Sequence, residues 1–212
     1  MKFLLVDDHA LFRDGLALLV SHEFPQLTLL QAADLAEAER CLDRHPDLRL
    51  VLLDLSLPDS EGLDGLQRLR ARAEHVIYVV LSADQSTPTI LAAIDAGAAG
   101  FIPKTTQSGV MLAALRTILA GGVYLPDGVA ARRAAPPDGG TGLGLSPRQA
   151  DVLRLLIEGK TNKLICRDLG LSESTVKTHL EAIFRRLEVS TRTQAVVAAA
   201  RLGLRLGEPL NT

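Results

Sequence analysis

Two stretches of the sequence, FLLVDD at residues 3–8 and LVLLD at residues 50–54, decide the fold of the first half of the chain. Each is an apolar run that ends abruptly in aspartate. A strand covered on both faces of a sheet has no polar side, so an unbroken apolar run predicts a buried strand of a parallel sheet. We therefore expect Asp7, Asp8 and Asp54 at the carboxyl ends of two such strands.

Short β-type runs and longer helical patterns alternate through residues 1–125. This alternation predicts parallel strands joined by right-handed helical crossovers. Five such units predict an α/β fold with an open, doubly wound five-stranded sheet, whose ligands bind at the carboxyl ends of the strands. The expected strands are Lys2–Val6, Leu27–Ala33, Leu50–Asp54, Val76–Leu81 and Gly100–Ile102, and the expected helices lie near Ala10–Ser21, Leu35–Arg44, Leu63–Ala71, Thr87–Ala96 and Gln107–Leu119.

The charges are divided unevenly along the 212 residues. Residues 1–125 carry 10 basic and 16 acidic side chains, whereas residues 146–206 carry 11 basic and 6 acidic ones. An acidic half joined to a basic half indicates two tasks, and the basic half is the candidate for a polyanionic partner. The stretch between them, residues 126–145, is rich in Pro, Gly and Ala and predicts a linker. A partly helical connector at Val129–Ala135 is the alternative.

The sequence favours a cytoplasmic protein. No apolar stretch approaches the roughly 18–20 residues of a membrane span. The apolar run Met1–Val6 is too short for a signal peptide. Cys41 and Cys166 have no metal-ligand spacing, so neither a disulfide scaffold nor a cysteine metal site is expected.

Only helical signals follow residue 145. Ser146, Pro147 and Gln149 form the start signal of a helix to about Glu158, because they combine a cap residue, proline and a capping-box partner. A second helix is expected near Asn162–Leu169, a third from the cap Ser172 to about Leu187, and a fourth over Arg192–Leu202. We expect a domain of residues 1–121, a linker of residues 122–145 and a small all-α domain of four helices at residues 146–206.

The acids of the first half predict a phosphoryl-transfer site. Asp7, Asp8 and Asp54 converge if their strands are neighbours across the switch point of the sheet. Clustered carboxylates repel one another and need a cation, and Mg²⁺ suits oxygen ligands. Ser82 and Lys104 follow the next two strands. Asp54 would be the nucleophile, the metal and Lys104 would neutralise charge, and Ser82 would bond a phosphoryl oxygen.

Taken singly, these residues have ordinary structural interpretations. Asp8 would cap the first helix, Ser82 would cap the fourth, and Lys104 would be a solvated lysine. The arrival of all of them at successive strand ends favours the functional interpretation.

Four segments carry a resemblance. LLVDDHALFRDGL, VLLDLSLPDSEGL, VLSAD and GAAGFIPKT are similar to the receiver domain of response regulators in two-component signalling, over about residues 1–121. The resemblance implies that Asp54 accepts a phosphoryl group from a sensor histidine kinase, that Asp7 and Asp8 bind the metal with Asp54, and that Ser82 is the switch hydroxyl. It also makes Lys104 the invariant lysine and Phe101 the aromatic switch, and matches Pro58 and Gly62 to the loop after Asp54.

Phe101 departs from the tyrosine of many receivers. Phenylalanine has no hydroxyl to donate, although its ring can still rotate into space that Ser82 vacates. A fixed core residue is the alternative at this position.

The second half predicts a helix-turn-helix, because two of its expected helices are joined by a tight turn at Gly170–Leu171. The third helix buries one apolar stripe, Val176, Leu180, Ile183, Phe184 and Leu187. Base contacts are expected from Lys177, Thr178 and Glu181, with Arg185 also outward, and phosphate contacts from Thr175, His179, Lys163 and Arg186. The alternative is a solvated helix in which Lys177 and Glu181 merely pair.

Residues 145–196 are similar to the LuxR-type helix-turn-helix, which with the receiver implies the NarL/FixJ class of response regulators. The sequence departs from the usual pattern at Gln149, Leu164, Cys166 and Glu181. The last helix, with the run QAVVAAARL, matches the helix that the family uses as a dimer contact, and core packing is its alternative.

We therefore expect a transcriptional regulator that binds double-stranded DNA under phosphorylation control. A homodimer is expected on phosphorylation or on DNA. No enzymatic activity is expected beyond self-phosphorylation and self-dephosphorylation at Asp54. A constitutive DNA-binding protein whose receiver is only an interaction surface is the alternative, and a phosphatase with an aspartyl-phosphate intermediate is the least favoured.

Overall fold

The computed structural model describes residues 1–126, 145–202 and 204. The chain divides into two compact units, Met1–Leu115 and Arg116–Thr212, and each is described by itself. Most of the predicted linker, with its alternative helix at Val129–Ala135, lies outside the described residues. The domain limits at residues 121 and 146 stay a prediction. In the described part of the chain, no helix is long and apolar enough to cross a membrane.

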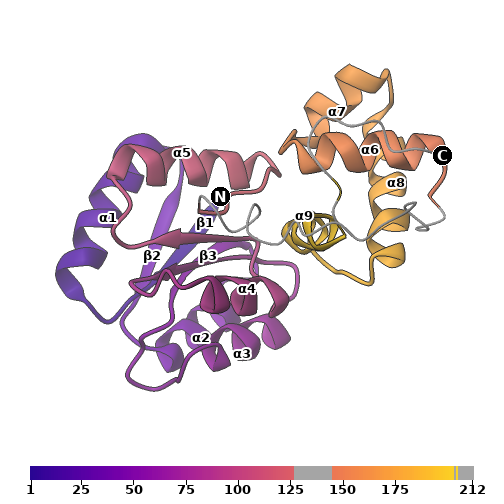
Figure 1. Ribbon diagram of the computed structural model, residues 1–212. Helices are drawn as coiled ribbons and strands as arrows, with labels where there is room; N and C mark the ends of the chain where they lie inside the picture. The colour runs from indigo at the N-terminus through magenta and orange to yellow at the C-terminus, as the bar shows by residue number, and fades with distance from the viewer. Residues whose placement is uncertain (127–144, 203, 205–212) are drawn as a thin grey trace. The chain divides into compact units, whose positions relative to one another are not determined.

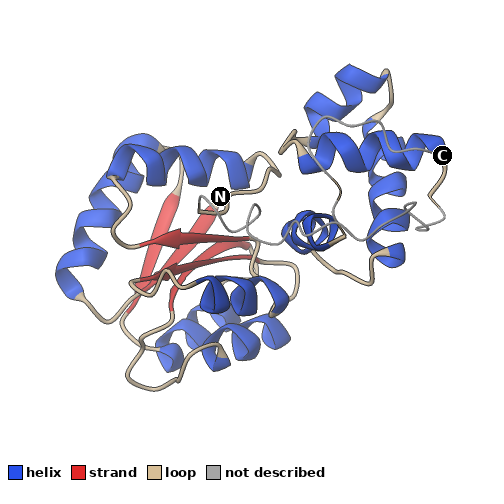
Figure 2. Ribbon diagram, viewed as in Figure 1, coloured by secondary structure: helices blue, strands red, loops and turns tan. Residues whose placement is uncertain are grey.

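The first unit is a five-stranded parallel sheet in the order β2-β1-β3-β4-β5, which confirms the predicted fold class. Figure 1 shows α1 and α5 on one face of the sheet and α2, α3 and α4 on the other, and Figure 2 sets the strands apart from these helices. The strands are β1 (Lys2–Val6), β2 (Thr28–Ala32), β3 (Leu48–Asp54), β4 (Ile77–Ser82) and β5 (Gly100–Pro103). The helices are α1 (Ala10–Glu23), α2 (Leu35–Arg44), α3 (Asp64–Arg72), α4 (Thr87–Asp95) and α5 (Ser108–Leu119).

The strand register brings the acids together. The chain order reverses between β1 and β3, which are neighbours although β2 lies between them in sequence. Val6 of β1 pairs with Leu53 of β3, so Asp7, directly after β1, and Asp54, the last residue of β3, lie side by side. Every apolar residue of the two deciding stretches is fully buried, because helices cover both faces.

Neither Asp8 nor Ser82 caps a helix in this unit, although their ordinary structural interpretation was as caps of the first and fourth helices. The N-cap of α1 is His9, whose side chain makes no capping hydrogen bond, so Asp8 does not cap that helix. Ser86 caps α4 by accepting a hydrogen bond from Thr89 N, so Ser82 is free of that task. Both capping alternatives are therefore wrong.

The second unit contains the four predicted helices, α6 (Pro147–Ile157), α7 (Asn162–Leu169), α8 (Glu173–Arg186) and α9 (Arg192–Arg201). The capping box of Ser146 and Gln149 is confirmed, with both reciprocal hydrogen bonds present. Between α7 and α8, Gly170 has a φ of 64°, a left-handed conformation that glycine adopts without the steric cost of a Cβ atom. This residue makes the tight turn of the helix-turn-helix.

The core of the second unit joins α8 to the other helices. Val176, Leu180 and Ile183 recur at helical spacing on α8 and are buried, as predicted. The small residues of α9 face the same core, where Ala195 and Ala199 are fully buried. Core packing therefore accounts for part of the small-residue stripe, and the dimer contact stays a prediction.

Candidate functional site

Lys104 links two buried carboxylates at the carboxyl edge of the sheet. Its Nζ lies 2.8 Å from Asp7 Oδ2 and 2.7 Å from Asp54 Oδ2. Asp7 is 0% and Asp54 1% exposed, and the Lys104 side chain is 14% exposed. Burial lowers the pKa of Lys104, but the hydrogen bond with Asp54 and the charge attraction of both carboxylates outweigh it, so the net pKa is raised. The structural alternative of a solvated lysine is wrong.

Two oxygens of this cluster are buried without a hydrogen-bond partner, Asp54 Oδ1 and Asp7 Oδ2. Asp7 Oδ2 lies close to Lys104 Nζ but makes no hydrogen bond with it, so that contact is electrostatic. Buried oxygens normally have partners, and Asp54 Oδ1, which has neither a hydrogen bond nor an ion pair in a cluster of acids, fits a ligand of a cation. Ligand atoms of Asp7, Asp8, His9 and Asp54 all lie within 4.8 Å of one another. The residues therefore fit a divalent metal ion.

Sequence reasoning did not single out His9. Its Nδ1 lies 2.6 Å from Asp8 Oδ1, and its backbone N–H donates to Asp7 Oδ1 at 2.9 Å. The amide contact holds the Asp7 carboxylate in place, and the imidazole holds that of Asp8. The position of His9 directly after the two aspartates was the available signal.

Ser82 and Phe101 lie on the neighbouring strands. Ser82 ends β4, is 3% exposed, and its Oγ accepts a hydrogen bond from Asp84 N at 3.1 Å. Its carbonyl oxygen accepts from Lys104 N at 2.9 Å, which joins the ends of β4 and β5. Phe101 is fully buried in β5. Burial fits both a fixed core residue and one rotamer of a switch, so the switching role stays a prediction.

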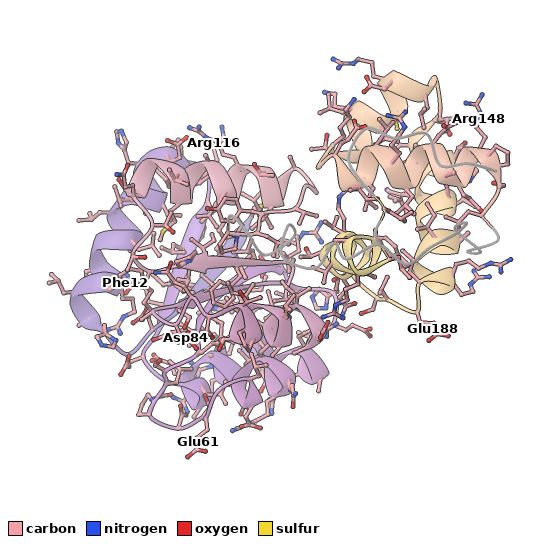
Figure 3. All side chains as sticks on the ribbon, in the orientation of Figure 1. Phe12, Glu61, Asp84, Arg116, Arg148 and Glu188 are labelled. Carbon is pink, nitrogen blue, oxygen red and sulfur yellow. The ribbon has the colours of Figure 1, made fainter. Side chains whose placement is uncertain are left out.

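Two loops flank the site and contact each other. Gln85 Nε2, after β4, donates to Thr105 Oγ1, after β5, at 2.7 Å. Lys104 Nζ also lies 5.0 Å from the centre of the Phe12 ring on α1, within range of a cation–π contact. Figure 3 labels Phe12 on α1 and Asp84 in the loop after β4, two of the segments that surround the cluster.

The outward face of α8 carries a polar stripe. Its exposed residues include Ser174, Lys177, Thr178, Glu181 and Arg185, which follow one another at helical spacing. Lys177 Nζ pairs with Glu173 at 3.1 Å, so the predicted alternative pair of Lys177 with Glu181 is wrong. The stripe borders the tight turn at Gly170, where a recognition helix carries its base-contacting residues.

The residues predicted to contact phosphates differ in exposure. Within the described part of the second unit, the structure records no ion pair for Lys163, Arg185 or Arg186, and all three are exposed. Thr175 and His179 are half-buried. Thr175 Oγ1 lies 2.7 Å from Ser172 Oγ in the cap of α8. The exposed cations are therefore the stronger candidates for phosphate contacts.

Comparison with known proteins identifies both units. Residues 3–116 match the response regulator receiver domain, and residues 143–199 match the bacterial regulatory proteins of the LuxR family. The glycerol metabolism activator of Pseudomonas putida is 38% identical over 93% of this chain and 94% of its own. The nitrate/nitrite response regulator protein NarL of Escherichia coli K12 is 32% identical over 92% of each chain.

A solved structure agrees with these matches. The LuxR family DNA-binding response regulator from Silicibacter pomeroyi is 32% identical to this chain, with a TM-score of 0.54, over 60% of this chain and 98% of its own. A receiver joined to a LuxR-type helix-turn-helix defines a class of transcription regulators. The chain belongs to the response regulators of two-component signalling, in the NarL/FixJ class. It is a DNA-binding regulator under phosphorylation control, not a classical enzyme.

Proposed function

We propose that Asp54 is the phosphoacceptor of this regulator and that α8 reads operator DNA when Asp54 is phosphorylated. The observation that carries the proposal is the cluster at the end of β3, where Lys104 lies 2.7 Å from Asp54 and the second Asp54 oxygen is buried without a partner. A carboxylate oxygen with unused lone pairs beside a fixed cation is suited to attack phosphorus.

In the proposed reaction, a carboxylate oxygen of Asp54 bonds to the phosphorus of a phosphohistidine on the sensor kinase. The P–N bond breaks, and its electron pair stays on the imidazole nitrogen. Lys104 stabilises charge on the equatorial oxygens. Because Asp54 is 1% exposed, the loops above it must open for the donor.

Mg²⁺ held by Asp7, Asp8 and Asp54 would supply positive charge that neutralises the transferred group. The buried Asp54 Oδ1, which has no partner, supports this assignment. Asp7 is held in place by the His9 amide, whereas Asp8, more exposed, faces the imidazole of His9.

Ser82 would relay the phosphorylation to the rest of the receiver. Its Oγ acts as an acceptor from Asp84 N, so its hydroxyl proton is available for a phosphoryl oxygen. Movement of Ser82 toward the phosphoryl group would vacate space for the Phe101 ring. The consequence is a shift between two populations of the receiver, which changes the DNA affinity or dimerisation of the output domain.

Asp54→Asn tests the phosphoacceptor assignment. The full chain is incubated with acetyl phosphate and Mg²⁺, and phosphorylation is followed by intact mass. The wild type gains one phosphoryl group and Asp54→Asn gains none, while Asp59→Asn serves as the control in the loop that follows β3. A phosphorylated Asp54→Asn variant would refute the assignment.

DNA affinity in the same samples tests the coupling. The wild type binds operator-containing DNA more tightly after phosphorylation, and Asp54→Asn does not respond. An equal affinity of the phosphorylated and unphosphorylated wild type would favour the alternative, a constitutive DNA-binding protein whose receiver is an interaction surface.

A further inference from the structure

Glu181 is the one acidic side chain in the middle of the outward stripe of α8. Ser174, Lys177, Thr178, Glu181 and Arg185 stand at the helical intervals of three and four residues that place side chains on one face. The opposite face holds the buried residues Val176, Leu180 and Ile183. If α8 lies in the major groove, Glu181 therefore faces the bases two turns into the helix.

The neighbours of Glu181 on this stripe are already engaged. Lys177 pairs with Glu173 at 3.1 Å, and Thr178 Oγ1 donates its proton to Ser174 O at 3.1 Å. Among the described residues, the structure records no hydrogen bond or ion pair for Glu181, which is exposed. Its carboxylate is thus free to meet a ligand in the groove without breaking a contact of the protein.

A carboxylate in the major groove makes strict demands on the base beside it. It is an acceptor only and is repelled by the phosphates, so it needs a donor that offsets the loss of water. Guanine presents two acceptors and thymine presents an acceptor and a methyl group. Adenine sets its amino donor beside the acceptor N7, whereas cytosine presents its N4 amino group with no acceptor next to it.

We propose that Glu181 is a specificity-determining residue that fixes a cytosine at one position of each operator half-site, through acceptance of a hydrogen bond from its N4 amino group. The proposal rests on the proposed function, in which α8 reads the major groove. Glu181 contributes more to the exclusion of the other three bases than to the strength of binding, because its negative charge lowers the affinity of the protein for DNA in general.

In vitro selection from a pool of randomised DNA duplexes tests the proposal. The full chain, phosphorylated with acetyl phosphate and Mg²⁺, is compared with Glu181→Ala, Glu181→Gln and the control Asp151→Asn. The control removes one half-exposed negative charge, which pairs with Arg148 on α6, and leaves α8 unchanged. The wild type and the control select the same sequence, with cytosine fixed at one position of each half-site.

The two Glu181 variants separate specificity from folding. Glu181→Ala accepts all four bases at that position and keeps the rest of the selected sequence. Glu181→Gln prefers adenine there, because a carboxamide matches adenine N6 and N7 together. Replacement of the cytosine weakens wild-type binding about tenfold or more and leaves Glu181→Ala binding unchanged.

Two outcomes overturn the inference in distinguishable ways. If Glu181→Ala selects the same fixed cytosine as the wild type, Glu181 does not read that base, although the proposed DNA binding stands. If the phosphorylated wild type selects no sequence at all, the proposed function fails and the inference fails with it.

Discussion

Lys104 in the first unit and Arg192 in the second are both partly buried cations, and the two have opposite surroundings. In the receiver, Lys104 lies between the carboxylates of Asp7 and Asp54, and its pKa is raised. In the output domain, Arg192 at the start of α9 donates to Lys160 O and to Asn162 Oδ1, and burial lowers its pKa to about 10. Among the described residues the structure records no ion pair for Arg192, whose Nε is buried without a hydrogen-bond partner.

The difference is between a cluster of charges around Lys104, suited to chemistry, and a set of hydrogen bonds from Arg192 that only holds the fold together. The contacts of Lys104 are ionic and lie at the site that we propose for the metal ion and the phosphoryl group. The contacts of Arg192 are to neutral acceptors, and they join α9 to the turn before α7. Its pKa of about 10 lies well above neutral pH, so Arg192 stays charged and its contacts are constant.

Lys104→Met would give the largest effect on stability. It leaves two buried carboxylates without their cation, so we expect the free energy of unfolding to fall by about 3–5 kcal/mol without divalent cations. Urea denaturation measures the loss, and hydrogen exchange assigns it to the receiver. Lys177→Met is the control, since the exposed pair with Glu173 contributes less than about 1 kcal/mol. Equal losses of unfolding free energy in Lys104→Met and Lys177→Met would refute the idea that the buried ion pairs stabilise the protein more than the exposed one.

Mg²⁺ would reverse part of that loss. At about one hundred times its dissociation constant, a cation that binds only the folded receiver stabilises it by about 2.7 kcal/mol. We expect this gain in Lys104→Met and its disappearance when Asp7→Asn is added. The output domain, which contains Arg192, should show no change in hydrogen exchange. A gain that persists with Asp7→Asn would place the ion elsewhere.

Arg192→Met would cost less than Lys104→Met. It removes two hydrogen bonds to neutral acceptors and leaves no unpaired charge, so we expect a loss of about 1–2 kcal/mol. Faster hydrogen exchange at the start of α7, near Asn162, would locate the effect. If Arg192→Met lost more unfolding free energy than Lys104→Met, the hydrogen bonds of Arg192 to neutral acceptors would stabilise the protein more than the ionic cluster around Lys104.

Tyr78→Phe tests a buried polar group that carries no charge. Tyr78 donates to Leu69 O at 2.8 Å and lies 3.1 Å from Ala73 O, so we expect a loss of about 1 kcal/mol. Burial raises the pKa of Tyr78. Above about pH 10 the unfolded chain loses this proton while the folded chain keeps it, so stability falls as pH rises. Denaturation at several alkaline pH values should show a shallower fall in Tyr78→Phe; identical pH slopes would contradict this.

Arg186→Ala would give the smallest change in stability. Arg186 is exposed on α8 and has no recorded ion pair in the described part of the domain, so the free energy of unfolding should change by no more than about 0.5 kcal/mol. Its effect would appear in the salt dependence of DNA binding, where the loss of one phosphate contact lowers the slope by about 0.9. An unchanged slope would exclude a phosphate contact of Arg186.

Much of the fold was predictable because its signals are local. The apolar runs that end in Asp7 and Asp54 specified buried strands, and the cap at Ser146 and the glycine at Gly170 specified helix limits. Their physical causes act within a few residues. Local signals predict the ends of strands less exactly, because the ends depend on pairing with distant segments. β3 begins at Leu48 rather than at the predicted Leu50, since pairing with β1 extends it.

The site was predicted as a set of residues but not as a set of contacts. The alternation of strands and helices placed Asp7, Asp54, Ser82 and Lys104 at one edge of the sheet. It did not indicate that Lys104 would contact both carboxylates, or that His9 would face Asp8. Those contacts depend on side-chain rotamers, which neighbours from distant segments select.

By itself, the sequence determined the α/β receiver, the helix-turn-helix and the identity of the acidic cluster, because periodicity, caps and strand-end residues are properties of short segments. Only the tertiary structure decided that Lys177 pairs with Glu173 rather than with Glu181, and that Arg192 is partly buried beside neutral acceptors. Burial and pairing of a charge depend on what packing brings near it. The environment of each cation is therefore a property of the folded chain.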